Sequence, residues 1–134
     1  MSEENVEILR RGFEAFAHGD IETVLELAGP DPVWAPGILP VMGGKAIRGA
    51  DALRRFFTQD LWEAFDEFRA EPLSFEDLGD SVLAPTRYVG RGERSGVEIE
   101  QTFFSVYKFR AGKIVWFRDF DTRAEALKAA GLRE

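Results

Sequence analysis

The segment KIVWFRDFD, residues 113–121, is an apolar run that ends in charged side chains. Alternation along a β-strand divides its side chains between two faces: Ile114, Trp116, Arg118 and Phe120 on one, and Val115, Phe117, Asp119 and Asp121 on the other. Both faces begin apolar and become polar near the end. We therefore expect a strand in which one face changes from packed core to the floor of a pocket.

A longer strand is expected just before it, from Val97 to Phe109. At ~3.3 Å per residue it would run about 40 Å, so it should curl around the interior of a small domain. One of its faces is apolar except at Gln101 and Ser105. These two residues either belong to a core face, satisfied by neighbouring backbone, or meet a ligand in a hollow core.

The order of the remaining elements predicts an α+β fold. Helical spacing of apolar residues covers 3–17, 21–28 and 49–68, and a long loop with a short strand at Val33–Trp34 follows the second helix. The stretch 81–109 predicts a hairpin around GRGERSG, and Thr122 with Glu125 forms a capping box for a helix over Arg123–Ala130. Helices first and a meander after is an α+β order.

Composition excludes several classes of function. The chain has 134 residues, the length of one domain spanning 1–134, with no cysteine, a single histidine (His18) and a formal charge of −7. Thiol chemistry, a His-based metal site and phosphate-binding loops therefore have no support, and nucleic acid is a poor partner for an acidic surface. The sequence has neither a membrane-length apolar run nor a secretory signal at residues 1–11, so we expect a cytoplasmic protein without metal or organic cofactor.

Three stretches carry a family resemblance: FEAFAHGDIETVLEL (13–27), AIRGADALRRFF (46–57) and FRAGKIVWFRDFDTRAEAL (109–127). They resemble the SnoaL-like branch of the nuclear-transport-factor-2-like (NTF2-like) superfamily, which includes ketosteroid isomerases, polyketide cyclases and limonene-epoxide hydrolases. The resemblance implies a curved, mostly antiparallel mixed sheet wrapped around N-terminal helices, cone-shaped and with a deep pocket. Because this scaffold hosts unrelated functions, the resemblance indicates the fold more specifically than the chemistry.

The catalytic residues of ketosteroid isomerases are missing at the matching positions. Gly12 stands where those enzymes have a tyrosine, Ala35 where they have the aspartate base, and Ser105 where they have a protonated aspartate. Steroid isomerisation by that mechanism is therefore not expected. Epoxide hydrolases of the superfamily use an Asp-Arg-Asp cluster, but Arg87 has the wrong strand parity to join Asp119.

The resemblance implies a set of site residues. Asp119 is the candidate general acid or base, and Asp121 is a second carboxylate near the strand's end; the alternatives are an Asp119 that is solvated or paired with Arg118 or Arg123, and a structural Asp121 beside the Thr122 cap. The loop 36–48 would form a lid. The other candidate substrate-binding residues line the pocket or orient substrate oxygens: Tyr88, Gln101, Ser105, Trp34, Phe16, Phe103 and Phe117.

Three functions stay open from sequence. The first is an acid-base enzyme of isomerase, cyclase or hydrolase type acting on a small apolar, oxygen-bearing molecule. The second is a non-catalytic binding module with an open pocket and an ion-paired Asp119, and the third is a dimerisation domain whose cavity is filled by aromatic rings. The outer sheet face, with Phe104, Val106, Trp116 and Phe120, is too large for the last helix to cover, which predicts a homodimer.

Overall fold

The fold is described by a computed structural model covering residues 2–39 and 45–131. Its N-terminal half contains α1 (Ser2–Ala17), α2 (Ile21–Leu27), β1 (Ala28–Ala35), β2 (Ile47–Arg48), α4 (Ala50–Arg55), a π-helical segment (Phe56–Asp60) and α5 (Leu61–Ala64). The rest contains β3 (Phe65–Pro72), β4 (Glu76–Asp77), β5 (Ser81–Gly92), β6 (Glu98–Arg110), β7 (Lys113–Phe120) and α6 (Arg123–Ala129). This is the expected α+β order.

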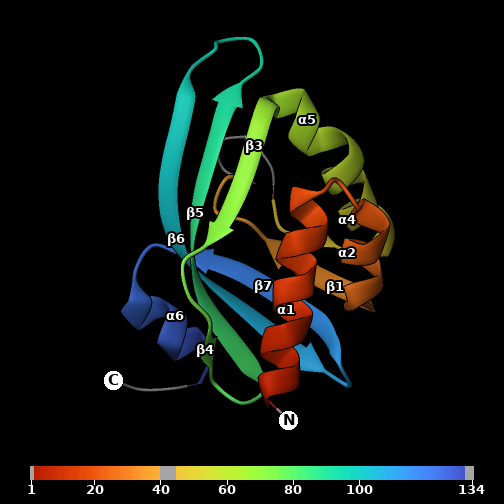
Figure 1. The fold of residues 1–134 in the computed structure, drawn as a ribbon, viewed down its shortest axis with the longest axis vertical. Coiled ribbons are helices and arrows are strands. Elements are labelled where there is room, and N and C mark those ends of the chain that lie inside the picture. The colour runs from red at the N-terminus through yellow and green to blue at the C-terminus, as the bar shows by residue number, and fades with distance from the viewer. Residues whose placement is uncertain (1, 40–44, 132–134) are drawn as a thin grey trace.

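One mixed sheet organises the molecule. Its strands follow the order β2-β1-β7-β6-β5-β3, with β4 beside β5; β1 and β7 run parallel, and the other pairs are antiparallel. Figure 1 shows α1, α2, α4 and α5 together on one side of this sheet and α6 on the other. The curled, mostly antiparallel sheet over N-terminal helices confirms the expected architecture.

The helix expected over 49–68 ends earlier, at Ala64. Phe65 and Phe68 fit the helical spacing but belong to β3, which pairs with β5 from Phe65↔Gly92 to Pro72↔Thr86. Pairing with a neighbouring strand overrides local propensity here. Likewise Ala28, expected at the end of the second helix, begins β1, which pairs with β7 at Ala28↔Ile114.

The helix ends carry the expected caps. Thr23 N donates to Asp20 Oδ1 at 3.2 Å at the start of α2, and Glu125 N donates to Thr122 Oγ1 at 3.2 Å at the start of α6. Each cap satisfies a backbone donor that the first helical turn leaves unpaired.

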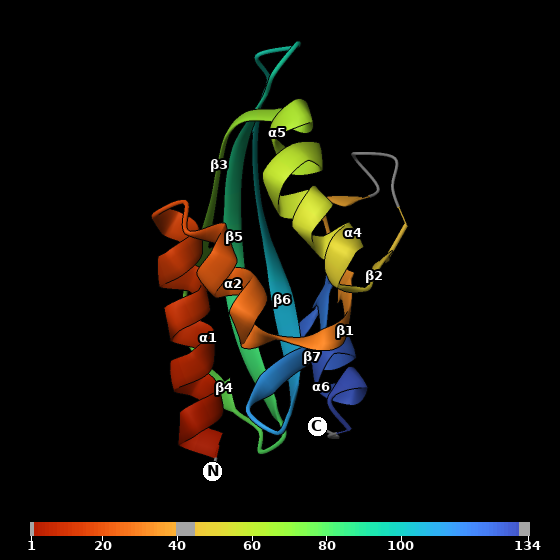
Figure 2. The same ribbon diagram turned by 90° about the vertical axis from the view of Figure 1, so that its right-hand side faces the viewer.

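Figure 2 shows the β5–β6 hairpin projecting beyond α5, away from both helix layers.

Two apolar clusters lie on opposite faces of the sheet. The larger one, between the sheet and the N-terminal helices, includes the fully buried Leu53 and the buried Trp34 and Phe117. The smaller one places Ala126 and Leu127 of α6 over Leu83 and Val106. The helix therefore covers Val106 of the outer face but leaves Phe104, Trp116 and Phe120 half-buried at its edge.

Candidate functional site

A cluster of polar side chains lies across three neighbouring strands on the inner face of the sheet. Asp119 of β7 is the direct register partner of Ser105 in β6, and Ser105 pairs in turn with Ala84 of β5. Thr86 and Tyr88 follow Ala84 at two-residue intervals, so strand alternation keeps them on the same face. The regular ladder itself therefore brings these hydroxyls to the carboxyl group.

The Asp119 carboxyl group is buried, with 9% of the residue exposed, and each of its oxygens is hydrogen-bonded. Oδ1 accepts from the Ser105 hydroxyl at 2.5 Å and from the Tyr88 hydroxyl at 3.2 Å. Oδ2 accepts from the backbone N–H of Gly37 at 2.8 Å. All three donors are neutral, which distinguishes this carboxyl group from the ion-paired one expected for a non-catalytic binding module.

A chain of hydroxyl groups continues from Ser105 into the sheet. Ser105 Oγ lies 3.1 Å from Thr86 Oγ1, and Thr86 Oγ1 donates to the carbonyl of Ala84 at 2.8 Å. Ser105 and Thr86 are both fully buried. Each hydroxyl carries one hydrogen, and Thr86 gives its own to Ala84. Ser105 therefore donates to Asp119 when the carboxyl group is ionised, and can donate to Thr86 when Asp119 is protonated and donates to Ser105.

Gly37 reaches the carboxyl group because β1 runs parallel to β7. Ala35 is the register partner of Arg118, and the chain that leaves β1 passes over the end of β7. A Cβ atom at Gly37 would lie 2.5 Å from the Phe103 ring, so the close approach of this backbone N–H requires glycine.

Burial sets the protonation chemistry of the site. Desolvation raises the pKa of Asp119 from 3.8 to about 6, although the hydrogen bonds from Gly37, Ser105 and Tyr88 each lower it. Burial, and then the nearby Asp119, raise the pKa of Tyr88 well above its ordinary value of 10. Near neutral pH the site thus contains a carboxyl group poised to exchange a proton and a phenol that resists ionisation.

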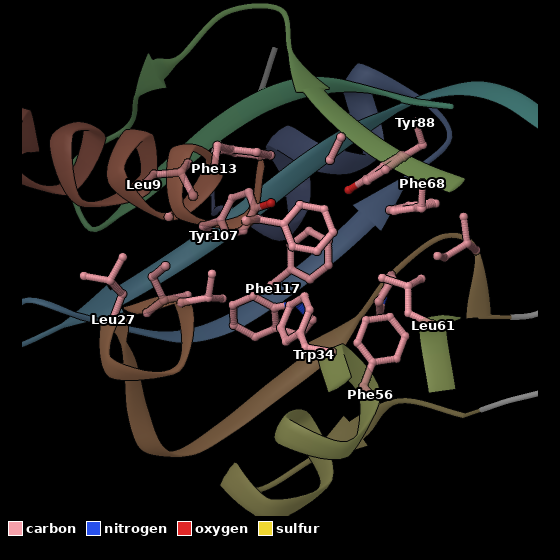
Figure 3. A pocket seen from close by; sticks show the side chains of 18 residues that line it. Leu9, Phe13, Leu27, Trp34, Phe56, Leu61, Phe68, Tyr88, Tyr107 and Phe117 are labelled. Atoms are coloured by element: carbon pink, nitrogen blue, oxygen red, sulfur yellow. The ribbon is translucent and has the colours of Figure 1, made fainter. Parts of the chain in front are cut away.

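An apolar pocket lies beside this cluster, between the sheet and the helices (Figure 3). Its volume is about 90 Å³, below the ~300–1,000 Å³ typical of sites for drug-sized ligands. Aromatic rings dominate the wall, among them Trp34 and Phe117 with centroids 5.1 Å apart, and Phe117 and Tyr107 stacked at 4.7 Å. Both Phe56 and Phe57 face the interior, because the π-helical turn brings consecutive side chains inward.

Tyr88 connects the pocket to the polar cluster. Its ring lines the pocket, whereas its hydroxyl donates to Asp119. Asp119 itself lines an outer groove on the other side, together with Gly37, Phe103, Lys45 and Arg118. The carboxyl group therefore lies between an apolar interior and a polar exterior.

The structure separates the residues expected to line one pocket into two groups. Trp34, Phe16, Phe117 and Tyr88 line the apolar pocket. Gln101, Phe103 and Asp121 border the outer groove instead. Gln101 and Phe103 belong to the first half of β6, which curls away from the pocket, and Asp121 follows the end of β7.

Burial separates the candidates further. Gln101 and Asp121 are exposed, whereas Phe103 is buried against Tyr88, with ring centroids 5.9 Å apart. Asp119 is buried, whereas Asp121 is exposed to solvent. Ser105 lines neither cavity and acts on the site through its contact with Asp119.

Arg87 and the loop 36–48 were also assigned positions from the sequence. Arg87 pairs with Glu71 and with Glu100 on the opposite face of the sheet, as its parity indicates. Of the expected lid, Pro36 and Ile38 line the apolar pocket, while residues 40–44 lie outside the described part of the chain. Arg123, the other arginine considered for Asp119, pairs with Glu76.

Two features of the site have no counterpart in the sequence pattern. The Gly37 N–H is a backbone donor, and the residue type does not indicate which acceptor a backbone donor will meet. Tyr107 lies on the predicted inner face, yet only the structure shows that it lines the pocket and is 5% exposed.

No group of three or more His, Asp or Glu side chains within 2–39 and 45–131 is arranged to hold a metal ion. Over the same residues, no helix has the length and apolar character needed to cross a membrane.

The sequence matches the family model of the SnoaL-like domain over residues 9–117. This protein belongs to the SnoaL-like domain family. No functionally curated protein shows detectable sequence similarity to this SnoaL-like chain. The matched region contains every strand of the polar cluster except the last residues of β7, where Asp119 lies.

Solved structures share the fold over nearly the whole SnoaL-like chain. An NTF2-like protein of unknown function from Burkholderia pseudomallei is 25% identical, with a TM-score of 0.77 over 93% of this chain and 95% of its own. TerC, co-crystallised with polyporic acid, is 21% identical, with a TM-score of 0.76 over 89% and 92%. SalBIII, an epoxide hydrolase/cyclase-like enzyme in pyran ring formation of the polyether salinomycin, is 20% identical, with a TM-score of 0.72 over 92% and 95%.

Proposed function

We propose that this protein is an acid-base enzyme of isomerase, cyclase or hydrolase type that acts on a small, apolar, oxygen-bearing molecule in the aromatic pocket. The observation that carries the proposal is the buried Asp119 carboxyl group, whose pKa is raised to about 6 and which is joined by a hydrogen bond to the pocket-lining Tyr88. A carboxyl group with such a pKa can both accept and donate a proton near neutral pH.

Tyr88 is the group that meets the substrate in this proposal. Acting as a base, the Tyr88 oxygen accepts a proton from the substrate while its own hydroxyl proton passes to Asp119 Oδ1. Acting as an acid, protonated Asp119 returns that proton to Tyr88, which delivers its hydrogen to a substrate oxygen. Tyr88 gains one proton as it loses another, so the relay avoids the phenolate that burial makes unfavourable.

The rest of the cluster holds the relay in position. Ser105 and Gly37 donate to the Asp119 carboxyl group, and Phe103 packs on the ring of Tyr88. These contacts fix both partners before a substrate arrives, which lowers the reorganisation that proton transfer would otherwise need. The two enzyme classes in the description of SalBIII, epoxide hydrolase and cyclase, also depend on proton transfer at substrate oxygens, which is compatible with this proposal.

Proton exchange from small ketones tests the proposal without knowledge of the natural substrate. Phenylacetone and 2-tetralone would be incubated with the protein in D₂O, and loss of the α-proton signal followed by NMR. We expect the wild type to accelerate exchange over Asp119→Asn by about 100-fold or more. Asp31→Asn, which alters an exposed aspartate of β1, is the control that keeps the wild-type rate.

A second candidate function is ligand binding without chemistry. The apolar wall of the pocket favours it, because such a wall can hold an apolar ring without a reacting group. The neutral hydrogen-bond partners of Asp119 differ from the ion pair expected for a binding module. Probes that bind the wild type but exchange no faster than in Asp119→Asn would support this function and contradict the enzyme.

A homodimer through the outer sheet face completes the proposal. Phe104, Trp116 and Phe120 form a half-buried aromatic patch beside α6. Lys108 lies over the Trp116 ring and Arg118 over the Phe120 ring, at 4.4 Å and 5.1 Å from the centroids. An aromatic patch rimmed by cations has the composition of a protein interface.

A further inference from the structure

The hydroxyl of Tyr107 is a polar group at the wall of the apolar pocket. Tyr107 is 5% exposed and lines the apolar pocket, and among the described residues its hydroxyl finds no partner. Its ring is fixed by stacking on Phe117 and by an edge contact with Phe13 at 6.1 Å. Figure 3 shows the Tyr107 oxygen pointing into the space that the pocket's side chains surround. Every buried side-chain nitrogen or oxygen of the described residues has a hydrogen-bond partner, so the Tyr107 oxygen is open to the pocket, where a ligand acceptor can take its hydrogen.

The indole of Trp34 presents a second unpaired donor to the same pocket. Trp34 is 7% exposed, and its Nε1 likewise has no hydrogen-bond partner within the described residues. The two rings are neighbours, with centroids 6.2 Å apart and planes at 69°. Since an indole N–H can only donate, a ligand group near it must accept.

The remaining wall restricts the charge of the ligand. The described residues that line the pocket carry apolar or uncharged side chains throughout, so an anion would lose its water there without gaining a counter-ion. The one hydroxyl already engaged is Tyr88, whose hydrogen is directed to Asp119. When Asp119 is ionised, a carbonyl oxygen in the pocket therefore finds its free donors at Tyr107 and Trp34.

We infer that Tyr107, supported by Trp34, is a specificity-determining residue that selects neutral, planar molecules carrying a carbonyl oxygen. The inference rests on the proposed function, because it assigns the substrate class of the same pocket. In the productive complex, one oxygen function of the ligand accepts from Tyr107, and a second position reacts at Tyr88. Carboxylates of the same shape are rejected.

Three probes of nearly identical shape test this selection at pH 8, where Asp119 is ionised. Acetophenone carries a carbonyl oxygen, α-methylstyrene has a methylene group in its place, and benzoate carries a charge. Dissociation constants would be measured by NMR titration of the full chain, in the wild type, Tyr107→Phe and the surface variant Asp31→Asn. The ratio of two constants within one variant cancels any general loosening of the pocket.

We expect Tyr107→Phe to shift the acetophenone-to-α-methylstyrene ratio by about three- to tenfold against acetophenone, the effect of one lost hydrogen bond. Asp31→Asn, an exposed position of β1 that does not line the pocket, should leave the ratio unchanged, and benzoate should bind most weakly to the wild type. The inference is overturned if Tyr107→Phe leaves the ratio unchanged, or if benzoate is the tightest ligand of the wild type. Neither result contradicts the proposed function, because an aromatic ring still binds in the pocket. If no neutral probe binds the wild type, the proposed function fails, and this inference fails with it.

Discussion

Ser105 and Asp119 are direct partners in the antiparallel pairing of β6 with β7, and the Ser105 hydroxyl donates to Asp119 Oδ1 at 2.5 Å. The contact is made between two regular strands, without a loop, so the position of the carboxyl group is as rigid as the sheet. Thr86 supports Ser105 from the next strand, at 3.1 Å between the hydroxyl oxygens. The proposed proton-transfer group thus lies on a continuous three-strand ladder.

The stability of the protein should depend on pH through Asp119. Burial raises its pKa from 3.8 to about 6 in the folded state, so the folded chain holds this proton more tightly than the unfolded chain. The resulting stabilisation is complete below about pH 3.8 and is lost as the pH rises through about 6, a change of about 3 kcal/mol. Asn at 119 cannot ionise. We therefore expect the difference in unfolding free energy between Asp119→Asn and the wild type, measured in urea, to shift by about 3 kcal/mol in favour of the variant between pH 4 and 7.5. A difference that does not change with pH would contradict the burial argument.

Removal of the hydroxyl donors should raise the pKa of Asp119 further. Both Ser105 and Tyr88 stabilise the ionised carboxylate, and the Ser105 hydrogen bond has the larger effect on its pKa. We expect the pKa in Ser105→Ala to exceed that in Tyr88→Phe, and both to exceed that of the wild type. Carbon-13 NMR of the aspartate carboxyl groups measures all three values. A lower pKa in either variant would show that the donor does not act on the charged form.

Gly37→Ala should disrupt the site, because the new Cβ would lie 2.5 Å from the Phe103 ring. Relief of this clash moves the loop and its N–H away from Asp119 Oδ2, so we expect a raised pKa for Asp119 and a loss of stability of about 1–3 kcal/mol. Gly12→Ala is a matched control within α1. Its Cβ would meet Leu27 at 3.5 Å, an ordinary contact, and alanine should stabilise the helix by about 0.5–1 kcal/mol. Equal effects of the two substitutions would refute the role given to Gly37.

The fold was largely predictable because its strongest signals are local. The alternation of β7, the Asp20 and Thr122 caps and the hairpin between β5 and β6 all depend on neighbouring residues. The boundary at Ala64 depends instead on a distant partner. Phe65 and Phe68 continue the helical spacing, and only pairing with β5 makes them a strand.

The candidate site was predictable only where a side chain's own strand determines its position. The family resemblance, together with alternation along each strand, predicted Asp119, Ser105 and Tyr88 on one face, and hydrogen bonds join them. Strand parity could not show that curvature leaves Gln101 exposed, that a backbone N–H from Gly37 arrives from β1, or that Tyr107 lines the pocket. Each of these depends on packing between strands that are distant in sequence.

The proposed dimer predicts a change of mass when the outer aromatic patch is made polar. Phe120→Ser removes a half-buried ring beside α6, and we expect it to convert a dimer into a monomer. Val97→Ser is the control, since it alters an exposed apolar residue of the β5–β6 hairpin, remote from α6 (Figure 1). Light scattering coupled to size exclusion measures both masses. A monomeric wild type, or a dimer that persists in Phe120→Ser, would argue against this interface.

The ionisation of Asp119 in the ligand-free wild type tests the central claim most directly. The claim requires a carboxyl group that exchanges its proton near neutral pH, and carbon-13 NMR of the protein labelled at its aspartate carboxyl carbons follows that group between pH 3 and 8, with Asp119→Asn identifying its signal. We predict a midpoint at about 6. A midpoint at or below the ordinary value of 3.8 would mean that Asp119 is a fixed anion, and the proton relay through Tyr88 would be wrong.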